Sequence, residues 1–551
     1  ILDLSIAGKQ PMHYLDRYTI TFNGEIYNYL EIKETLLAKG YQFKSNSDTE
    51  VLLALYDAKK ENCLADLDGM FAFAIWDKHT QELFCARDRF GEKPFYYHTD
   101  SDKSFYFASE MKALFAAGIN KTHHEKMYFN YWFYDSIIDP ENLKNTFFDQ
   151  IYCLEPAHYL KYNTHLASFS IVRYWDLNPN NIDSSITEAQ AQTKLSELLY
   201  SSVRKRLRSD VPVGSSLSGG LDSSVIVKLI EQVKDANVKQ KTFSAKFPNY
   251  KKDESKYIQI MLDNLKIEGF GCFPNQDSML ANIDKIIYHQ EEPFGSASIN
   301  AQFEVMQLAR ANGVIVMLDG QGADEILCGY HGLADSFFYE LKKTDKALYN
   351  EQLTNYKALQ KNNQINSLSR RLRNNIIKDY LSNQQLNQVL ALKAGMSETF
   401  KASVKKDFYE TYKNQQFAKQ YKFDTLNNAL YYATTKGGLQ ELLRYADRNA
   451  MANSIETRLP FLSHQLVEYI FTLPAIMKVK DGFTKHILRK VADDLPLPKE
   501  ITWRVDKIGY EPPQSDWMQK VSIDDKKKNY HFIEQEKKLS DSQKWKVFVS
   551  H

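Results

Sequence analysis

Two short stretches rich in glycine, serine and aspartate carry the residues best suited to chemistry. The first is Ser218-Gly219-Gly220-Leu221-Asp222-Ser223-Ser224. Its two glycines lack a Cβ, so backbone N–H groups can approach an oxyanion closely. The start of the following helix adds unpaired N–H donors and partial positive charge. Because Asp222 would repel a phosphate unless a cation lay between them, the string predicts a phosphate site that uses Mg²⁺.

A simpler interpretation of this first stretch is a glycine-rich turn whose Asp or Ser caps a helix. It is not a Walker loop, because no GxxxxGK[ST] string occurs. The whole string, placed between a predicted strand and an amphipathic helix, favours the phosphate interpretation. It resembles the pyrophosphate loop of the ATP-pyrophosphatase family, whose members cleave ATP between the α- and β-phosphates.

The second stretch is Asp319-Gly320-Gln321-Gly322-Ala323-Asp324-Glu325, which follows the apolar run 314–318. A ligand site just after a parallel strand fits the general rule for open α/β sheets. Asp324 and Glu325 could share Mg²⁺ or hold a substrate ammonium group, whereas the alternative is a turn capped by acids. An adenylating site also needs a cation near the α-phosphate. Segments 444–462 and 483–489 supply basic residues, although such residues are often helix-surface charges.

The elements that position these stretches change in character near residue 180. Residues 1–178 contain aromatic-rich runs separated by short polar turns, such as 69–77 with 82–90, which predict antiparallel hairpins. A polar linker, 177–185, follows. From residue 186 onward strands alternate with helices, which predicts a parallel α/β sheet. Strands are expected at 211–217, 241–247 and 314–319, and helices at 189–207 and 222–234.

Composition excludes several classes of protein. Lys+Arg 70 against Asp+Glu 69 leaves a net charge of +1, so there is no electrostatic footprint for nucleic acid or an anionic membrane. No apolar run approaches the length of a membrane span. The five cysteines are widely spaced without a CxxC pair, which favours reduced thiols in a cytoplasmic protein. The charged tail 522–551 is interpreted as a solvated surface helix or end.

Taken together, the motifs resemble the glutamine-dependent asparagine synthetases over nearly the whole chain. The markers are Asn23-Gly24-Glu25-Ile26-Tyr27-Asn28, Ser47-Asp48-Thr49-Glu50, Gly69-Met70-Phe71-Ala72-Phe73, Ala86-Arg87-Asp88-Arg89-Phe90-Gly91, the two stretches above, and Glu456-Thr457-Arg458-Leu459-Pro460-Phe461. The resemblance implies an α+β half at 1–178, a truncated αββα sandwich of antiparallel sheets with glutaminase function. It implies an α/β synthetase half at 186–551, a parallel-sheet nucleotide-binding domain with helical additions.

The resemblance also implies roles for individual residues. Asn23 and Gly24 would form an oxyanion hole, and Glu25 and Asp48 would hold the glutamine α-amino group. Asp222 and Asp324 would bind Mg²⁺ on pyrophosphate, and Lys485 would stabilise the α-phosphate. Glu325 and Arg448 would contact aspartate. The remaining nucleotide contacts would be Leu217, Ser218, Gly219, Gly220, Ser223, Ser224, Ala245, Gly320 and Gln321.

The chemistry implied by the resemblance has two steps. The aspartate β-carboxylate attacks the α-phosphate of ATP to give β-aspartyl-AMP and pyrophosphate, and ammonia then displaces AMP to form asparagine. In the family, ammonia comes from glutamine through a thioester on an N-terminal cysteine and travels through an internal tunnel. The implied ligands are ATP, Mg²⁺, aspartate, and glutamine or free ammonia. A homodimer is compatible with the resemblance, and the sequence leaves the oligomeric state open.

Two departures from the family pattern stand out. The nucleophilic cysteine and the segment after it do not occur before Ile1, so we expect upstream residues to be missing, and none of the five cysteines stands at the matching place. Gln321 occupies a position where well-known asparagine synthetases carry Glu, and an amide cannot act as a general base. The sequence therefore leaves open which acid is amidated. Relatives that close β-lactam or lasso-peptide rings also vary at this cluster.

Three competing hypotheses remain beside an aspartate-amidating enzyme. One is another ATP-dependent amide-forming enzyme acting on a different acid in a biosynthetic cluster. A tRNA-modifying ATP pyrophosphatase would need a basic patch and catalytic cysteines, which the composition disfavours. A non-catalytic nucleotide-binding relative is disfavoured by the intact set of Asp222, Asp324 and Lys485.

Overall fold

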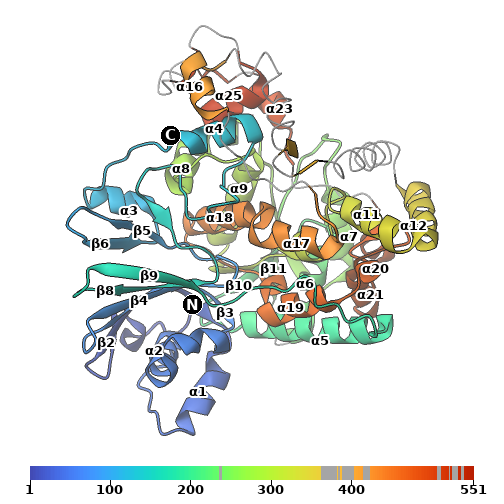
Figure 1. Cartoon of the computed structure of the whole chain (residues 1–551). Helices are drawn as coiled ribbons and strands as arrows, with labels where there is room; N and C mark the ends of the chain where they lie inside the picture. Colours follow the sequence, from blue (N-terminus) through green and yellow to red (C-terminus); the bar gives the residue numbers. More distant parts are fainter. Residues whose placement is uncertain are drawn as a thin grey trace.

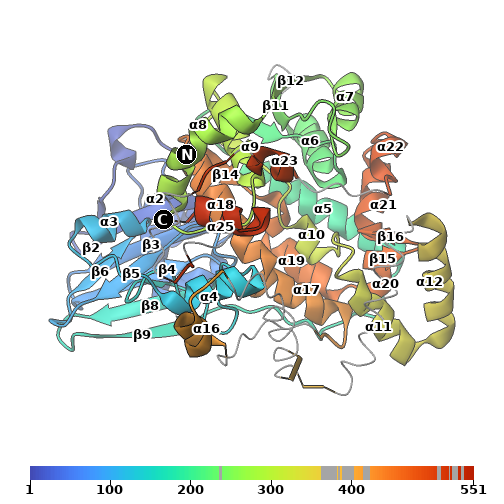
Figure 2. The same cartoon turned by 90° about the horizontal axis from the view of Figure 1, so that it is seen from above.

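A computed structural model of the chain describes residues 1–234, 239–360, 381–382, 385–386, 403–413, 422–505, 511–519, 521–523, 532–534 and 539–550. The two large antiparallel sheets lie within residues 12–173, and the parallel sheet lies within 213–458 (Figures 1 and 2). The predicted fold class, with an antiparallel first half and a parallel second half, is confirmed. In the part of the chain that is described, no helix combines the length and the apolarity needed to cross a bilayer.

The first half is built on two antiparallel sheets. One has six strands in the order β1-β2-β3-β4-β8-β9, and the other has three in the order β6-β5-β7. The elements up to residue 173 are η1 (Ile6–Gly8), β1 (Met12–Tyr14), β2 (Tyr18–Ile26), α1 (Tyr29–Leu37), α2 (Asp48–Lys59), η2 (Lys60–Asp66), β3 (Gly69–Asp77), β4 (Glu82–Arg87), β5 (Tyr96–Thr99), β6 (Phe105–Ala108), α3 (Met111–Ala116), α4 (Glu125–Tyr134), β7 (Tyr152–Cys153), β8 (His158–Asn163) and β9 (Ser168–Arg173).

Alternation along β3 sets the layers of this half. Phe71, Phe73 and Ile75 pack on one face of the large sheet, in a core shared with α1 and α2. Ala72 and Ala74 point to the other face, where they meet Tyr97 of the small sheet. Helix α3 packs on the β5–β6 side of the small sheet. The result is the αββα layering that the resemblance implied (Figure 1).

The second half contains a five-stranded sheet in the order β12-β11-β10-β13-β14, and all its strand pairs are parallel. Its elements are α5 (Glu188–Arg206), β10 (Val213–Ser216), α6 (Leu221–Val233), β11 (Gln240–Ala245), α7 (Ser255–Asn264), β12 (Ile267–Cys272), α8 (Gln276–Gln290), α9 (Ser298–Ala311), β13 (Val316–Leu318), α10 (Ala323–Ile326), α18 (Gly438–Met451), β14 (Glu456–Arg458), η3 (Pro460–Leu462) and α19 (His464–Thr472). Helices cover both faces of this sheet.

Helical additions complete the second half. They are α11 (Ala334–Thr344), α12 (Lys346–Leu359), α16 (Lys406–Tyr412), α17 (Leu426–Thr435), α20 (Ala475–Lys478), the ribbon β15 (Val479–Lys480) with β16 (Phe483–Thr484), α21 (His486–Asp494), α22 (Lys499–Thr502), α23 (Gln514–Met518) and α25 (Asp541–Phe548). The helical stretch expected at 334–430 is confirmed where it is described. Residues 361–380, 383–384, 387–402 and 414–421 lie outside the described residues, as does the lysine run 526–528 of the tail.

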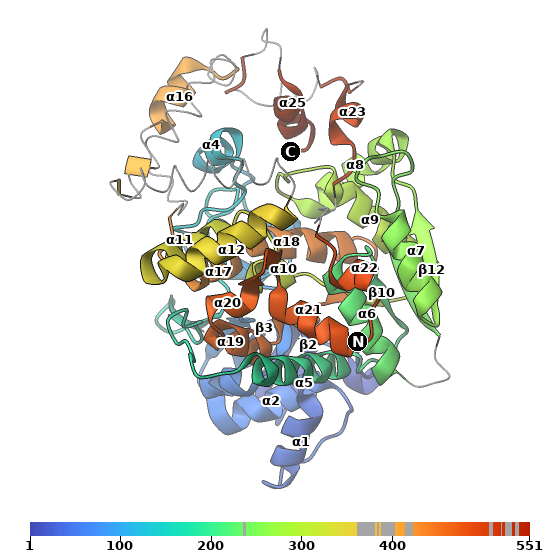
Figure 3. The same ribbon diagram turned by 90° about the vertical axis from the view of Figure 1, so that its right-hand side faces the viewer.

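Helices α5, α6 and α21 pack against one another beside the parallel sheet (Figure 3). Helix α6 forms because Val225, Ile226, Leu229 and Ile230 give it one apolar stripe, which is buried. Helix α5 begins with a capping box between Thr187 and Gln190. Because α6 starts directly after β10, the loop between them lies at the carboxyl end of the sheet, where β13 also ends.

Candidate active site

The loop at 217–220 joins the strand β10 to the helix α6, as the sequence predicts. Gly219 adopts φ 74°, and a Cβ there would lie 2.6 Å from Cβ of Tyr257, so a larger residue does not fit. The hydroxyls of Ser218 and Ser223 lie 3.1 Å apart, and the Ser218 hydroxyl accepts from the Gly220 N–H at 3.3 Å. Ser224 is buried on α6. The loop therefore presents a glycine backbone and hydroxyls at a helix N-terminus.

Three elements that are far apart in sequence bring the central charges together. Lys485 Nζ lies 2.5 Å from Oδ2 of Asp222 on α6 and 2.6 Å from Oδ1 of Asp324 on α10. Lys485 precedes α21 and has the left-handed backbone φ 54°, ψ 33°. Burial by itself lowers the pKa of Lys485, but the two carboxylates outweigh it and raise that pKa above its ordinary value. The Lys485 ammonium group is therefore protonated and lies between two carboxylates.

The acid stretch 319–325 forms the other wall of this cluster. A Cβ on Gly320 would lie 3.1 Å from Cβ of Asp222, so the two loops are in direct contact. Asp319 accepts from the Gly320 N–H at 2.6 Å, and burial raises its pKa. Glu325 is buried, and its carboxylate is one of the groups that raise the pKa of Tyr330, after burial. Gln321 has a buried side-chain oxygen with no hydrogen-bond partner among the described residues.

Residues predicted to contact adenosine lie at the ends of neighbouring strands. Leu217 follows β10, and its N–H donates to Phe243 O at 3.0 Å. Its carbonyl accepts from the Ser244 hydroxyl at 2.5 Å, which holds Ala245 at the end of β11 beside the loop. Leu217 and Ala245 are both buried. The predicted nucleotide contacts therefore converge on one edge of the sheet.

Several residues of this site were not nominated from the sequence. A Cβ on Gly329 would lie 1.7 Å from Oδ1 of Asp324 and 2.3 Å from Cε of Lys485, so any larger residue would force these side chains to move. Arg489 donates to Thr484 O at 2.8 Å and to Arg504 O at 2.9 Å, which ties the Lys485 segment to the loop beside Gly219. No local motif marks Gly329, because the side chains close to it come from segments that meet only in the fold. Nothing in the sequence distinguishes Arg489 from a surface arginine.

The predicted metal ligands fit Mg²⁺ in kind. Asp222 and Asp324 are carboxylates from separate elements that converge on one point, and Mg²⁺ takes one or two protein carboxylates together with phosphate oxygens. In the ranges that the structure describes, no group of three or more His, Cys, Asp or Glu side chains is placed to hold a metal by itself.

The Arg448 guanidinium forms ion pairs with two glutamates. Its Nη2 pairs with Glu291 at 2.8 Å and its Nη1 with Glu110 at 3.4 Å, at the junction of the two halves. It lines a cavity of about 70 Å³ between the halves, whose walls are Arg87, Gly91, Glu92, Pro94, Tyr96, Ile137, Ile138, Leu143, Asn145, Thr146, Cys153, Pro156, Glu292, Gln440, Arg444, Asp447 and Arg448. Such a volume holds a few water-sized molecules.

The second set of predicted residues gathers at the end of β2. Gly24 has φ 147°, and a Cβ there would lie 2.0 Å from Met70 O, so glycine is required. Asn23 donates from Nδ2 to Ser109 Oγ at 3.3 Å. Asp48, at the start of α2, accepts from the Ile26 N–H at 2.8 Å. Burial raises the pKa of Asp48 to about 6.

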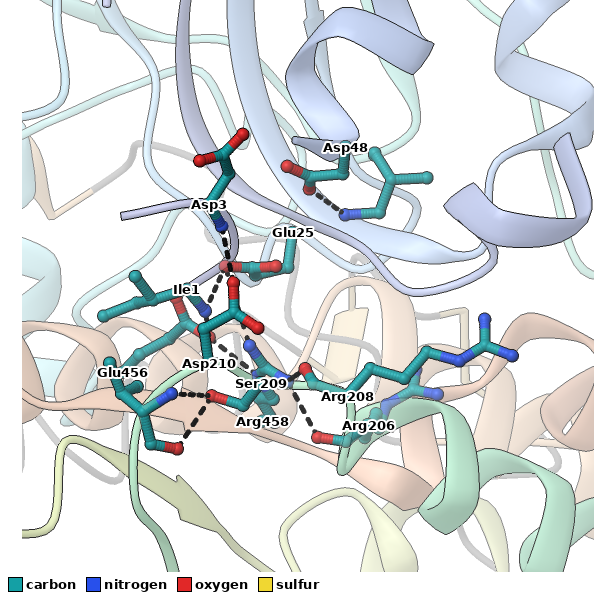
Figure 4. Close-up of polar contacts among 12 residues, drawn as sticks. Ile1, Asp3, Glu25, Asp48, Arg206, Arg208, Ser209, Asp210, Glu456 and Arg458 are labelled. Atoms are coloured by element: carbon teal, nitrogen blue, oxygen red, sulfur yellow. Dashed lines mark hydrogen bonds and ion pairs between the residues drawn. The ribbon is translucent and has the colours of Figure 1, made fainter. Parts of the chain in front are cut away.

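Glu25 is buried beside this set and faces the second half (Figure 4). Its Oε1 lies 3.6 Å from Nη2 of Arg458 and also contacts the amino group of Ile1. Burial, with smaller contributions from Glu456 and Asp48, raises the pKa of Glu25 to about 8. Glu25 and Asp48 are therefore two buried carboxylates at one place, which suits an ammonium ligand.

Comparisons with known proteins match both halves of the chain. The family model described as Asparagine synthase matches residues 194–529, and the one described as Glutamine amidotransferase domain matches residues 1–175. The chain is 31% identical over 520 residues to asparagine synthetase [glutamine-hydrolyzing] 1 of Bacillus subtilis (strain 168), covering 94% of this chain and 79% of that protein. It is 30% identical over 523 residues to asparagine synthetase 3 of the same organism, covering 90% and 76%.

A more distant relative has another name. Amidase chyE of Penicillium rubens is 26% identical over 559 residues, covering 94% of this chain and 80% of that protein. An amidotransferase half joined to an asparagine synthase half with a parallel sheet defines an ATP-driven ligase that forms carbon–nitrogen bonds. Within that class, the chain belongs to the asparagine synthase family.

Proposed function

We propose that this enzyme amidates aspartate to asparagine through a β-aspartyl-AMP intermediate. The aspartate β-carboxylate attacks the α-phosphate of ATP, pyrophosphate leaves, and ammonia then displaces AMP. The observation that carries the proposal is the cluster of Lys485, Asp222 and Asp324 beside the glycine loop. A fixed cation near the α-phosphate stabilises the charge that develops there in the transition state.

Each part of the cluster has a role in this proposal. Backbone N–H groups of Gly219 and Gly220 and the start of α6 bind the leaving phosphates. Asp222 and Asp324 would hold Mg²⁺, which would neutralise charge on the pyrophosphate. Glu325, which is buried in the acid stretch, would contact the aspartate ammonium group, and Gly320 and Gln321 would border the nucleotide.

Ammonia supply is assigned to residues 1–178, and synthesis to residues 186–551. Asn23 and Gly24 would stabilise an oxyanion of glutamine hydrolysis, and Glu25 and Asp48 would bind the glutamine ammonium group. The cavity between the halves, lined by residues of both, supports a route for ammonia from one to the other. Arg448 lines this cavity, and in this proposal it would contact aspartate together with Glu325.

A second candidate function is amidation of another carboxylic acid. It is favoured by Gln321, whose buried oxygen has no hydrogen-bond partner among the described residues and so offers an acceptor to a ligand. A buried acceptor without a partner carries a desolvation cost that a ligand N–H or O–H would remove. The relative named amidase chyE also lies outside the asparagine synthetases by name.

Pyrophosphate release separates the two candidates. The purified chain is given ATP, Mg²⁺ and ammonium, with and without aspartate, and the product is identified. Release that requires aspartate and yields asparagine supports the first function. A folded, ATP-binding enzyme whose release ignores aspartate points to another acid, and a panel of carboxylic acids then identifies it.

Asp222→Ala tests whether the cluster is the catalytic site. We expect this variant to lose ATP–pyrophosphate exchange, because it removes a phosphate-site carboxylate on the first turn of α6. Asp277→Ala is the matched control, since Asp277 lies in the first turn of α8 and is exposed. Unchanged exchange in Asp222→Ala would remove the enzyme interpretation of this cluster.

A further inference from the structure

Arg458 of β14 touches both candidate sites. It is completely buried, and its side chain runs from the parallel sheet toward the first half (Figure 4). Its Nη2 lies 3.6 Å from Glu25, and its Nε pairs with Glu456 at 2.7 Å. Its Nη1 donates to Arg206 O at 2.9 Å and to Arg208 O at 2.6 Å. These four contacts hold the guanidinium at one position and orientation.

The main chain of the same residue reaches the acid stretch. Arg458 is paired with Leu318 in parallel register, and its carbonyl accepts from the Asp319 N–H at 3.0 Å. Asp319 begins the stretch that contains Asp324, and its neighbour Gly320 contacts Asp222. Arg458 therefore contacts Glu25 through its side chain and the Asp319 N–H through its carbonyl oxygen. It is the one residue that links these two contacts.

The Arg458–Glu25 contact is incomplete. At 3.6 Å it is an ion pair, and Nη2 of Arg458 has no hydrogen-bond partner among the described residues. Charges buried in a low-dielectric environment interact strongly, so a ligand that binds Glu25 changes the electrostatic energy of Arg458. An ammonium ligand on Glu25 would take the place that the Ile1 amino group holds at this carboxylate, and would lie close to the guanidinium. Because the arginine is fixed at four contacts, it can respond chiefly by shifting with its strand.

We propose that Arg458 is a positioning residue that couples occupancy of the Glu25–Asp48 site to the geometry of the ATP site through the Asp319 N–H. This inference rests on the proposed function of Glu25 and Asp48 as the glutamine ammonium site. It adds that glutamine and ATP change each other's affinity through one named residue. The alternative is that Arg458 is a structural tie between the halves, which would stabilise the fold without linking the two ligands.

Calorimetric titration measures this coupling in the full chain. The Kd of ATP with Mg²⁺ is measured with and without saturating L-glutamine, and the Kd of glutamine is measured with and without ATP. We expect each ligand to change the Kd of the other by about fivefold or more, and by the same factor in both directions, since coupling is reciprocal. In Arg458→Met both ligands still bind, and the factor falls to about one.

Arg208→Met is the matched control. Arg208 also crosses between the halves, where it forms two bonds of 2.7 Å to Glu31, but its side chain faces neither candidate site. This variant keeps the coupling factor of the wild type. A structural tie would instead predict that both arginine variants lose stability and that neither changes the factor.

The outcomes distinguish the inference from the function beneath it. If both ligands bind the wild type and their affinities are independent, the inference is overturned while the proposed function stands. If glutamine does not bind at all, the assignment of Glu25 and Asp48 fails, and the coupling fails with it. If Arg458→Met does not fold, the coupling is tested in the wild type instead. Amide hydrogen exchange of segment 316–326 is then measured with and without glutamine. Glutamine must then alter exchange of the Asp319 amide, and unchanged exchange overturns the inference.

Discussion

Lys485 is the residue on which the adenylating chemistry depends most directly. It is held by two carboxylates and has a left-handed backbone, which is uncommon for a residue with a side chain and costs on the order of 1 kcal/mol or more. Such a conformation persists where the surroundings fix it, and here it directs the ammonium group between Asp222 and Asp324.

Replacing Lys485 by Met removes the charge and keeps much of the volume. We expect kcat for aspartate-dependent pyrophosphate release to fall by about 100-fold or more, as when one transition-state donor is removed elsewhere. Lys490→Met, on the same helix α21, serves as the control and keeps wild-type turnover. Wild-type kcat in Lys485→Met, measured in a continuous pyrophosphate assay, would contradict the assigned role.

Gly329 provides a steric test of the same cluster. In Gly329→Ala the new methyl would overlap Asp324 and the Lys485 side chain, so both must move. We expect ATP affinity and turnover to fall together, by at least about tenfold, because misplacement by an ångström is enough to cost such factors. Gly332→Ala, three residues on with nothing within 4 Å of the added Cβ, should retain wild-type activity. Equal activity of the two variants would show that the cluster is not strained by the methyl.

The sequence predicts some of these residues and not others for physical reasons. Asp222, Asp324 and Lys485 could be named because a glycine loop, an acid stretch and a cation are recognisable locally. Gly329 could not, since its role is a close approach between segments that meet only in the fold. Arg458 was part of a recognised motif, but its partners Glu25 and Asp319 come from different halves of the chain.

At the scale of elements, hydrophobic patterns predicted the long segments well. The helices expected at 189–207 and 222–234 are observed at Glu188–Arg206 and Leu221–Val233. Strand β14, only three residues long, was not expected, because period-two alternation cannot be recognised over Glu456–Arg458. Its place is determined by pairing with β13, which is a tertiary interaction.

Helix α20 contains a buried lysine that predicts a pH-dependent stability. Burial lowers the pKa of Lys478 from 10.5 to about 7, although its ammonium donates to Asn427 Oδ1 at 2.9 Å and Leu473 O at 2.6 Å. Between these two pKa values the unfolded chain binds more protons than the folded one, so this term makes stability rise with pH. Below pH 7 both states are protonated, and the full penalty is present.

The prediction is a difference in slope. Between about pH 7.5 and 9.5, the unfolding free energy of the wild type minus that of Lys478→Met should rise by about 1.4 kcal/mol per pH unit. Urea unfolding at several pH values measures it. Lys480→Met, at a partly exposed position two residues on, should show the wild-type pH dependence. Parallel curves for the wild type and Lys478→Met would refute the shifted titration.

At the scale of the whole molecule, the two halves share a core and several buried ion pairs. Residues of α4, such as Tyr131 and Trp132, belong to the same hydrophobic cluster as Phe243 of β11 and helices α8 and α9. Lys93 Nζ pairs with Asp447 at 2.8 Å across the junction, with both side chains buried. We therefore expect the two halves to unfold in one cooperative transition and not as two independent domains.

Lys93→Met tests the strength of this junction. Removing one partner of a buried pair leaves the other charge unpaired, at a cost of about 3–5 kcal/mol. We expect a clear drop in the thermal midpoint, and Lys93→Met combined with Asp447→Leu should recover much of it. Lys59→Met breaks the half-exposed Lys59–Asp66 pair and should cost about 0–1 kcal/mol. If the two single variants have equal midpoints, the buried pair does not hold the halves together.

The basic residues that cross the junction also limit how the halves can be recombined. Lys205, Arg206 and Arg208 of the second half meet Asp68, Tyr27 and Glu31 of the first, and Arg458 meets Glu25. A chimera that takes its glutaminase half from one relative and its synthetase half from another would combine interface residues that are not matched to each other. We expect such a chimera to assemble only when segments 205–210 and 456–458 are transferred together with the residues of the first half that they contact. The position of the cut in the linker does not change this requirement.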